Sequence, residues 1–487
     1  MHFAKIQEAL DAAPPGAVIA IADGTYEEAL SVTKAAKLVG RCAAKVTIVN
    51  PTAEALLANS APLDLRAVTL EGGKGAVASA PLRLEDVVVT GAFDHAIYTK
   101  VQTAPVTLLR SVVRGVRPNK ETYGQALVGV GGATIDLEES VVEDVVGRGG
   151  VIFDTGHIKL HRSVVRAMAV TPDWKFGNAF AAYAGGTLLI DESALVDTQR
   201  FCLAVAAGPS KASVTRSTIA NVGPDDTAPG IAVVVSDQGS IDFLDSSIDH
   251  VRGVAISLAG EDVRAAVKRT AITHSSAGSA RGYGSGLTVQ VRAQMTFDDS
   301  VIFDSTNVSV IAAAGTLKVA RSYIAHTTTD RYGAGGYAFG VSGGSDITIE
   351  GSTIEDSHEI AVIAEDRITR LSLTKSLVRG IGPNAEGKYG FGVAAFGDSR
   401  IDLDETIVTG AHVGAVVASD AQVRFRSGAV RSCPIGVHAQ DGSTVREGDP
   451  ARAPDANDMV VSENVVFDKV GTRVGGSEVV VPSPVLR

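Results

Sequence analysis

Carboxylates that could serve as an acid and base pair recur at one position of a repeated segment. Glu139 follows the apolar alternation of "IDLEES", and Glu192 follows that of "LIDES" 53 residues later. If the repeats stack, two such carboxylates would be separated by roughly the 6.5–9.5 Å that inverting glycosidases use. Arg162, however, occupies the same position halfway between them. An arginine there would hold both acids ionised, whereas a general acid must carry a proton. We therefore expect the pair to be structural.

The same position alternates between acid and base along most of the chain and breaks only at Gly351 and Ser427. In repeats stacked about 4.8 Å apart, opposite charges would pair from one repeat to the next, whereas like charges would repel. Exposed ion pairs contribute about 0.2–1 kcal/mol each, so this column should fix the register more than it stabilises the fold. The column consists of Asp86, Arg110, Glu139, Arg162, Glu192, Arg216, Asp245, Arg269, Asp299, Arg321, Gly351, Lys375, Glu405 and Ser427.

A small residue, most often serine, follows each member of this column and marks the repeat. Separations between successive markers alternate between 22–24 and 29–30 residues, and adjacent steps sum to 52–54. The positions five and three before a marker are almost always apolar, which is the period of a strand with one buried face. Steps this short hold three short strands and no crossover helix, so the units must stack as a solenoid. The markers are Val87, Ser111, Ser140, Ser163, Ser193, Ser217, Ser246, Thr270, Ser300, Ser322, Ser352, Ser376, Thr406 and Gly428.

The spacing predicts an all-β chain folded as a parallel β-helix, and parallel connections are overwhelmingly right-handed. Serine suits the marker position because its hydroxyl can bond backbone groups in a turn. The composition agrees, with 52 glycines, one tryptophan and 5% aromatic residues. A net charge of −11 argues against a nucleic-acid or anionic-membrane partner, and no apolar run is long enough to span a membrane. The three cysteines, Cys42, Cys202 and Cys433, lie too far apart to pair and are expected to be buried thiols.

The stretch "IQEALDAAPPGAVIAIADGTYEEALSVTKAAKLVG" resembles the first coil of right-handed β-helix proteins of the pectin-lyase-like superfamily. The matching elements are the helix, Pro15-Gly16 before a strand, Asp23-Gly24-Thr25-Tyr26 at a turn, and the strand that begins at Lys37. Later coils resemble those of secreted bacterial surface β-helix proteins, so the resemblance covers nearly the whole chain. It implies an extracellular or cell-surface location, with the targeting segment absent from this chain. The superfamily includes lyases, esterases, epimerases and non-catalytic surface proteins, but the diagnostic motifs of its uronan epimerases, pectin methylesterases and pectate lyases are absent.

We expect a single right-handed parallel β-helix solenoid in three parts. Residues 1–86 would hold a short N-terminal capping helix and the first coils, and residues 87–430 the regular two-coil repeat of about 53 residues. Residues 431–487 would form an irregular C-terminal cap and an extended tail. The helix would cover an open sheet end, because exposed sheet edges invite aggregation.

Each long step places its extra residues in a loop just after the marker, so six loops on alternate coils would form a row. Most of these loops end in an aromatic residue, and several carry a basic one. The rings could form a platform for sugar rings, with the cations beside uronate or sulfate groups; alternatively, each ring packs its own loop onto the next. The expected substrate-binding residues are Tyr123, Trp174, Phe176, Tyr283, Tyr337, Tyr389, Lys120, Lys175, Arg281, Arg331 and Lys388.

A second polar column lies four residues after the markers that precede short steps. Aspartate at a turn usually bonds its own backbone, and one carboxylate about every 10 Å does not make a calcium site. We therefore predict no metal site in this column. His250 follows Asp249, and His95 similarly follows Asp94, but a lone histidine in a turn is most often only a polar replacement. The column consists of Asp144, Asp197, His250, Asp304 and Asp356.

Three hypotheses about function remain open. Near-perfect repetition without an enzyme motif favours a non-catalytic extracellular or cell-surface protein that binds a polysaccharide or a partner along the loops. The superfamily resemblance implies, as the alternative, a polysaccharide lyase or epimerase that acts on an anionic uronate glycan. Only in that case would we expect a cofactor, namely calcium. The third hypothesis is a passive structural spacer. The sequence sets neither the catalytic residues nor the oligomeric state.

Overall fold

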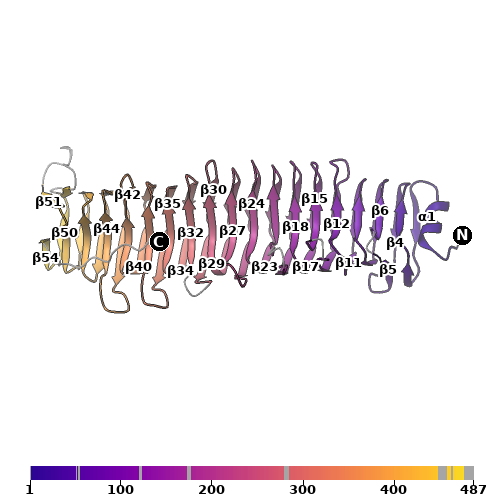
Figure 1. Ribbon diagram of the computed structural model, residues 1–487, viewed down its shortest axis with the longest axis horizontal. Helices are drawn as coiled ribbons and strands as arrows, with labels where there is room; N and C mark the ends of the chain where they lie inside the picture. Colours follow the sequence, from indigo (N-terminus) through magenta and orange to yellow (C-terminus); the bar gives the residue numbers. More distant parts are fainter. Residues whose placement is uncertain are drawn as a thin grey trace. The chain divides into compact units, whose positions relative to one another are not determined.

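The computed structural model describes residues 2–50, 52, 55–119, 123–172, 177–278, 284–447, 458–461 and 464–476. The chain divides into two compact units, unit 1 (Met1–Asp242) and unit 2 (Phe243–Arg487). Each unit is a stack of coils in which the chain visits three ladders of parallel strands, A, B and C, in that order (Figure 1). The predicted all-β parallel β-helix is confirmed.

The strands of unit 1 are short, and each pairs with the equivalent strand of the next coil. Ladder A contains β1 (Ala17–Ala20), β4 (Ala36–Val39), β7 (Leu63–Arg66), β10 (Leu82–Glu85), β13 (Val106–Leu109), β16 (Thr134–Glu138), β19 (His157–His161), β22 (Thr187–Asp191) and β25 (Lys211–Thr215). Ladder B contains β2 (Gly24–Glu27), β5 (Val46–Asn50), β8 (Thr69–Gly72), β11 (Val88–Thr90), β14 (Val112–Val116), β17 (Val141–Val146), β20 (Val164–Ala169), β23 (Ala194–Gln199) and β26 (Thr218–Gly223). Ladder C contains β3 (Leu30–Val32), β6 (Leu57–Asn59), β9 (Ala76–Ala78), β12 (His95–Thr99), β15 (Gln125–Gly129), β18 (Arg148–Ile152), β21 (Phe180–Tyr183), β24 (Phe201–Ala206) and β27 (Gly230–Ser236).

Unit 2 repeats this arrangement, and the boundary between the units falls within β28 (Ser240–Leu244). Ladder A contains β30 (Arg264–Lys268), β33 (Gln294–Asp298), β36 (Thr316–Ala320), β39 (Asp346–Glu350), β42 (Arg370–Thr374), β45 (Arg400–Asp404), β48 (Gln422–Arg426), β52 (Asp458–Val461) and β51 (Thr444–Glu447). Ladder B contains the first half of β29 (Ser247–Ala259), β31 (Ala271–Ser276), β34 (Val301–Thr306), β37 (Tyr323–Thr328), β40 (Thr353–His358), β43 (Leu377–Gly382), β46 (Ile407–Ala411), β49 (Ala429–Arg431) and β53 (Val466–Asp468). Ladder C contains the second half of β29, β32 (Ser285–Gln290), β35 (Val308–Ala313), β38 (Tyr337–Ser342), β41 (Ile360–Ala364), β44 (Phe391–Phe396), β47 (Gly414–Ser419), β50 (Ile435–Gln440) and β54 (Thr472–Gly476).

Alternating apolar residues fill the inside of each coil. In ladder A of unit 1, Ile135 pairs in register with Ile158, and Leu137 pairs with Leu160. All four side chains are buried, as their period of two predicts. Because equivalent residues stack from coil to coil, a one-residue slip would turn every apolar side chain of a strand outward.

The turn between ladders A and B has one conformation in coil after coil. Its first residue is the acid or base of the alternating column, where φ lies between 46° and 55°. Its second residue is the marker. The hydroxyl of Ser163 accepts a hydrogen bond from the backbone N–H of Ser140 in the preceding coil (3.1 Å) and donates one to the carbonyl of His161 (2.9 Å). The amide-to-hydroxyl contact recurs in unit 2 between Thr270 and Ser300, Ser300 and Ser322, Ser322 and Ser352, and Ser352 and Ser376.

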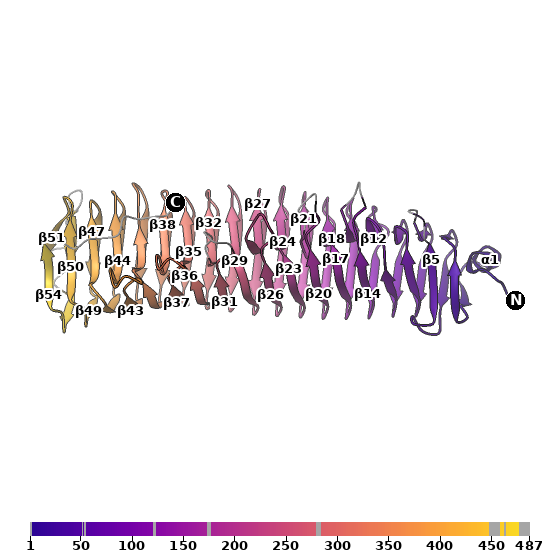
Figure 2. The same cartoon turned by 60° about the horizontal axis from the view of Figure 1, so that its bottom comes forward.

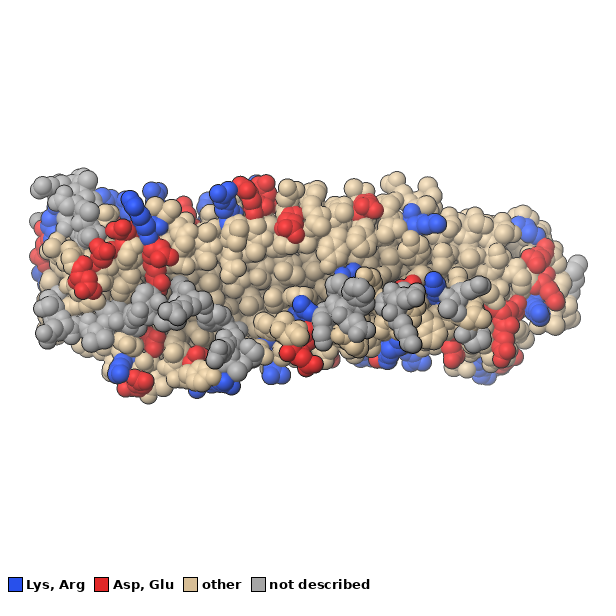
Figure 3. Space-filling model, in the orientation of Figure 1, with Lys and Arg blue, Asp and Glu red and all other residues tan. Residues whose placement is uncertain are grey.

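Opposite charges pair along the column, as predicted. In unit 1, Arg110 contacts Asp86 at 2.9 Å and Arg216 contacts Glu192 at 3.2 Å. In unit 2, Arg269 lies 2.6 Å from Asp245. Figure 3 shows basic side chains beside acidic ones at several places on the face that it displays.

The alternation of short and long steps arises between ladders B and C. In several short coils a single residue joins the two strands, as Gly147, Arg200 and Asn307 do, and each of these three has a positive φ. Long coils carry a loop at this place, such as residues 329–336 and 383–390. In these described coils, most of the extra length of a long step lies in this loop.

The helix α1 (Ile6–Ala12) lies at the N-terminal end of unit 1, as predicted (Figure 2). Its buried residues are Ile6, Ala9 and Leu10. The carboxylate of Glu28 accepts hydrogen bonds from the N–H groups of Ile6 (2.8 Å) and Gln7 (3.0 Å), so a residue of the first coil caps the helix. Among the described residues, no helix has the length and hydropathy of a membrane-spanning segment.

One expectation about the cysteines is wrong. Cys202 and Cys433 are buried, but Cys42 is exposed. Cys42 lies in the turn between β4 and β5, whereas Cys202 lies at a buried position of β24 and Cys433 is buried in the connection between β49 and β50.

The marker hydroxyls should contribute to stability. Ser163→Ala removes the acceptor of the buried Ser140 N–H, so we expect it to lower the free energy of unfolding by about 1–3 kcal/mol. Ser213→Ala, on an outward position of β25, should change it by less than about 0.5 kcal/mol. Urea unfolding followed by circular dichroism measures both, and equal midpoints for the two variants would contradict the role of the hydroxyl.

Candidate functional site: a row of histidines and aspartates

Ladder B bends at the fourth residue after each marker, where the backbone is left-handed. At His250, His274, Asp304, His326 and Asp356, φ lies between 53° and 62°. Histidine, aspartate and asparagine are the non-glycine residues enriched in this conformation. The bend interrupts the strand alternation and turns these side chains outward, as the burial pattern of β31 shows. We call these five residues of unit 2 the His–Asp row.

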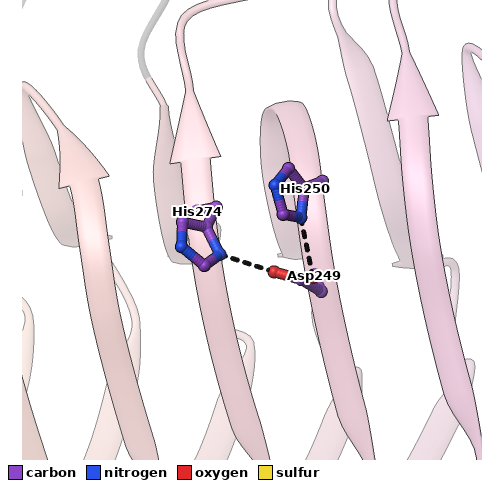
Figure 4. A group of neighbouring side chains, drawn as sticks. All are labelled: Asp249, His250 and His274. Atoms are coloured by element: carbon purple, nitrogen blue, oxygen red, sulfur yellow. Dashed lines mark hydrogen bonds and ion pairs between the residues drawn. The ribbon is translucent and has the colours of Figure 1, made fainter.

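Asp249 joins the first two histidines of the row (Figure 4). Its Oδ2 lies 2.7 Å from Nδ1 of His250, and its Oδ1 lies 2.7 Å from Nδ1 of His274 in the next coil. The hydroxyl of Thr273 donates a third hydrogen bond to Oδ1 (2.5 Å). The two imidazole rings stack with their centroids 4.5 Å apart and an interplanar angle of 23°.

The charge of Asp249 determines the tautomer of both neutral rings. Partial burial opposes its ionisation, but hydrogen bonds from Thr273, His274 and His250 outweigh burial and lower its pKa to about 2. An ionised carboxylate can only accept hydrogen bonds. Each neutral ring therefore carries its hydrogen on Nδ1, which leaves the lone pair of Nε2 free to accept a proton or a ligand.

The row continues through Asp304. Nε2 of His274 lies 3.9 Å from Oδ2 of Asp304, whose Oδ1 lies 3.0 Å from Nδ1 of His326. Nε2 of His326 in turn lies 4.0 Å from Oδ2 of Asp356. Phe303 stacks on the ring of His326 with a centroid distance of 5.5 Å. From His274 to Asp356, imidazoles and carboxylates thus alternate on successive coils.

A second polar group lies beside the row on the same ladder. The hydroxyl of Tyr323 donates a hydrogen bond to Oε2 of Glu355 (3.0 Å), and Arg379 donates one to the same oxygen (2.7 Å). Partial burial and the carboxylate of Glu355 raise the pKa of Tyr323, so that its phenol stays protonated at neutral pH. The hydrogen bond from Arg379 lowers the pKa of Glu355. Tyr323 is therefore a proton donor, and Glu355 is an anion.

Unit 1 has a similar group, but arginines occupy it. Nδ1 of His161 lies 2.8 Å from Glu138, and its Nε2 lies 3.8 Å from Asp191 and from Glu192. Arg216 contacts both Asp191 (2.6 Å) and Glu192 (3.2 Å). The carboxylates here are already paired with Arg162 and Arg216 of the charge column, so this group is part of its ion-pair network.

Six of the substrate-binding residues predicted from the sequence lie outside the described residues. They are Lys120, Trp174, Lys175, Phe176, Arg281 and Tyr283. Tyr123 is described, lies in unit 1 and is partly buried. The other four belong to the two long loops of unit 2, at residues 329–336 and 383–390, or to their ends.

Tyr337 and Tyr389 lie in one apolar cluster on ladder C of unit 2. Tyr337 is buried, and its hydroxyl donates a hydrogen bond to the buried Glu359 (2.9 Å). Burial and the nearby Glu359 raise the pKa of Tyr337. Its ring anchors the end of the loop and offers no face to solvent, because the loop folds back onto the coil.

The two described cations of the predicted set are exposed. Arg331 lies over the ring of Tyr332 at 4.7 Å, and Lys388 pairs with Glu386 at 2.8 Å. Tyr332 is the exposed ring of this loop, and the sequence prediction missed it in favour of Tyr337.

The sequence prediction also missed two members of the row. His274 and His326 lie four residues after the markers Thr270 and Ser322, whereas the predicted column used only the markers of alternate coils. Applying the same offset at every marker would have found both. His95, which was also singled out, is mostly buried 3.3 Å from Asp94.

No family model matches the chain, and no curated protein matches it. Among solved structures, the periplasmic alginate epimerase AlgG is 10% identical, with 75% of this chain and 77% of that chain covered and a TM-score of 0.39. A mutant of the PL6 family alginate lyase AlyGC is 11% identical over 95% and 88%, with a TM-score of 0.32. PfbA, a surface adhesin of Streptococcus pneumoniae, is 12% identical over 99% and 92%, with a TM-score of 0.26.

Similarities at this level carry no inference about what the chain does. The fold follows from the chain itself, through its three parallel ladders and the short turn between A and B. The chain is a parallel β-helix, as the spacing of its repeat predicted.

The low pKa of Asp249 predicts a pH-dependent contribution to stability. Its pKa of about 2 in the folded chain lies below the ordinary value of about 3.9 in the unfolded chain. The stabilisation is therefore present above about pH 4 and is lost as the pH falls through 2. Because the side chain is one-third exposed, we expect roughly 1 kcal/mol.

The measurement is urea unfolding of the wild type and Asp249→Asn at several pH values. The difference in unfolding free energy between them should be present at pH 7 and should shrink between pH 4 and 2. The matched control is Asp346→Asn, at an exposed position of β39. A difference that does not depend on pH would contradict the prediction.

Proposed function

We propose that the chain binds a polysaccharide that crosses the coils of ladder B in unit 2. The observation that carries this proposal is the set of exposed flat rings on and beside β37. Phe303 is 39% exposed, His326 stacks on it, and Tyr332 is 66% exposed in the loop that leaves β37. A sugar offers an apolar face of C–H groups, which packs on such rings.

Polar groups on the same coils suit the hydroxyl rim of a sugar. The carboxylates of Asp304, Asp356 and Glu355 can accept hydrogen bonds from hydroxyls, and Arg379 can donate them. Equivalent positions recur about every 4.8 Å along the stack, close to the length of one sugar in an extended polymer. Successive sugars could therefore meet equivalent groups on successive coils.

The predicted row of loops remains part of this proposal. Arg331 and Lys388 belong to loops that directly follow β37 and β43, next to the rings of ladder B. Their cations would contact carboxylate or sulfate groups of an acidic polysaccharide. An extracellular or cell-surface location goes with such a ligand and stays a prediction.

A second candidate function is β-elimination on a uronate polysaccharide, and the presence of both Tyr323 and His326 on β37 favours it. Asp304 orients His326 so that its Nε2 can accept a proton, while Tyr323 keeps its own. His326 would remove the proton at C5 of a uronate as the C4–O bond breaks and a C4–C5 double bond forms. Tyr323 would protonate the departing oxygen, and Arg379 would contact the uronate carboxylate.

The binding proposal predicts that removing the rings weakens retention of a polysaccharide. Phe303→Ala and Tyr332→Ala should each reduce affinity roughly 3- to 10-fold, because a stacked ring contributes about 0.5–1.5 kcal/mol. Affinity electrophoresis through gels that contain neutral or uronate polysaccharides measures this. The control is Leu189→Ala, which removes a similarly exposed apolar side chain in unit 1. Failure of every polysaccharide to retard the wild type, or equal retardation of all three variants, would contradict the proposal.

The elimination candidate predicts a new ultraviolet absorbance from unsaturated uronates. The protein is incubated with a panel of uronate polysaccharides, with and without calcium. We expect His326→Asn to abolish the signal and Tyr323→Phe to reduce it by about 10²-fold or more, while Leu189→Ala leaves it unchanged. Asparagine preserves the left-handed backbone at position 326. A flat trace with the wild type would remove this candidate and leave non-catalytic binding.

A further inference from the structure

We propose that Asp249, His250 and His274 bind a divalent transition-metal ion. One donor atom from each residue lies within 4.8 Å of the other two. Both Nδ1 atoms are 2.7 Å from oxygens of the same carboxylate, on opposite sides of its fork. One nitrogen of each ring therefore already lies against the carboxylate that would be the third ligand.

The donor types are those of an open zinc site. Two imidazole nitrogens and one carboxylate oxygen make a three-residue set that leaves a fourth position for water or another ligand. The side chains of His250, His274 and Asp249 are 60%, 46% and 34% exposed, so an ion can enter from solvent. Both histidines come from the left-handed bend of ladder B, which fixes them on adjacent coils.

Metal binding requires a change of tautomer and no net loss of hydrogen. A neutral ring that ligates through Nδ1 carries its hydrogen on Nε2 instead.

Groups around these three residues match the outer contacts of metal sites. Histidine ligands usually donate their second N–H to a carboxylate, which fixes the ring. Asp304 lies 3.9 Å from Nε2 of His274, where it could receive that hydrogen. The hydroxyl of Thr273 binds Oδ1 of Asp249 at 2.5 Å and holds the carboxylate.

The comparison with unit 1 separates this group from a chance cluster. His161, Asp191 and Glu192 also place one donor atom each within 4.8 Å of the other two, but Arg216 binds both carboxylates there. The charge of Asp249, by contrast, is stabilised by a hydroxyl and two imidazoles. Displacing an arginine from two carboxylates would cost a metal ion more than replacing two imidazole hydrogens.

Zinc titration of the untagged, chelator-treated full chain tests the proposal. Isothermal calorimetry should show one ion per chain, and cobalt should give the visible absorption of a four-coordinate ion. We expect His250→Asn, His274→Asn and Asp249→Asn each to weaken zinc binding at least about tenfold, and Asp304→Asn to weaken it about 10- to 100-fold. Asparagine keeps the left-handed backbone at both histidines, and circular dichroism checks the fold of each variant.

The matched control is His161→Asn, which should bind zinc as the wild type does. Absence of saturable binding by the wild type, or binding that His161→Asn removes and His250→Asn does not, would overturn the proposal. Phe303→Ala and Tyr332→Ala should leave zinc binding unchanged, so this site stands or falls independently of polysaccharide binding.

Discussion

The turn between ladders A and B is the constraint on which the rest of the structure depends. Its left-handed residue bends the chain from ladder A into ladder B, and the marker amide donates its hydrogen bond to the next coil. A serine hydroxyl of that coil accepts a hydrogen bond from this amide and donates one to the carbonyl two residues before it. Each coil is thus held to the next at one fixed register. Because the register is the same at every coil, residues that share an offset from the marker must stack.

Because the backbone is the same in each coil, the chemistry of the surface at a given position depends mainly on which side chain is there. The same backbone geometry carries very different chemistry at different offsets. One position before the marker, Arg216 forms ion pairs with the carboxylates of Asp191 and Glu192. Four positions after it, His250 and His274 share Asp249 and keep nitrogen lone pairs available. Arginine is always charged and fills its site, whereas imidazole can exchange a proton for another ligand.

The periodic features were predictable from the sequence because each is set locally and repeated many times. The strand alternation, the marker turn and the charge column all follow from the spacing of residue types. The exposure of Cys42 and the burial of Tyr337 were not predictable in this way. Cys42 lies in a turn outside the repeat, and the environment of Tyr337 depends on how its loop folds back onto Glu359. His274 and His326 were within reach, since they share the offset of His250, but the offset was applied to alternate markers only.

The alternation of short and long coils is itself explained by contacts at the single-residue junctions. Glu359 is the single-residue junction of a short coil in unit 2, and it accepts hydrogen bonds from the long loops before and after it. Its carboxylate accepts hydrogen bonds from Tyr337, at the end of the preceding long loop, and from Asn384 (3.0 Å) in the following one. Its carbonyl accepts the N–H groups of Gly390 and Phe391, where that second loop ends.

A short coil can therefore hold the long loops on both sides of it through hydrogen bonds. Asn307 has part of this role one repeat earlier, because its carbonyl accepts the N–H groups of Gly336 and Tyr337. In unit 1, Arg200 contacts Asp225 in the next long loop at 3.4 Å. If every coil carried a long loop, no junction would remain to hold them. The two-coil period thus anchors the described long loops of unit 2 where ladder B ends, beside the coils that the proposed polysaccharide would cross.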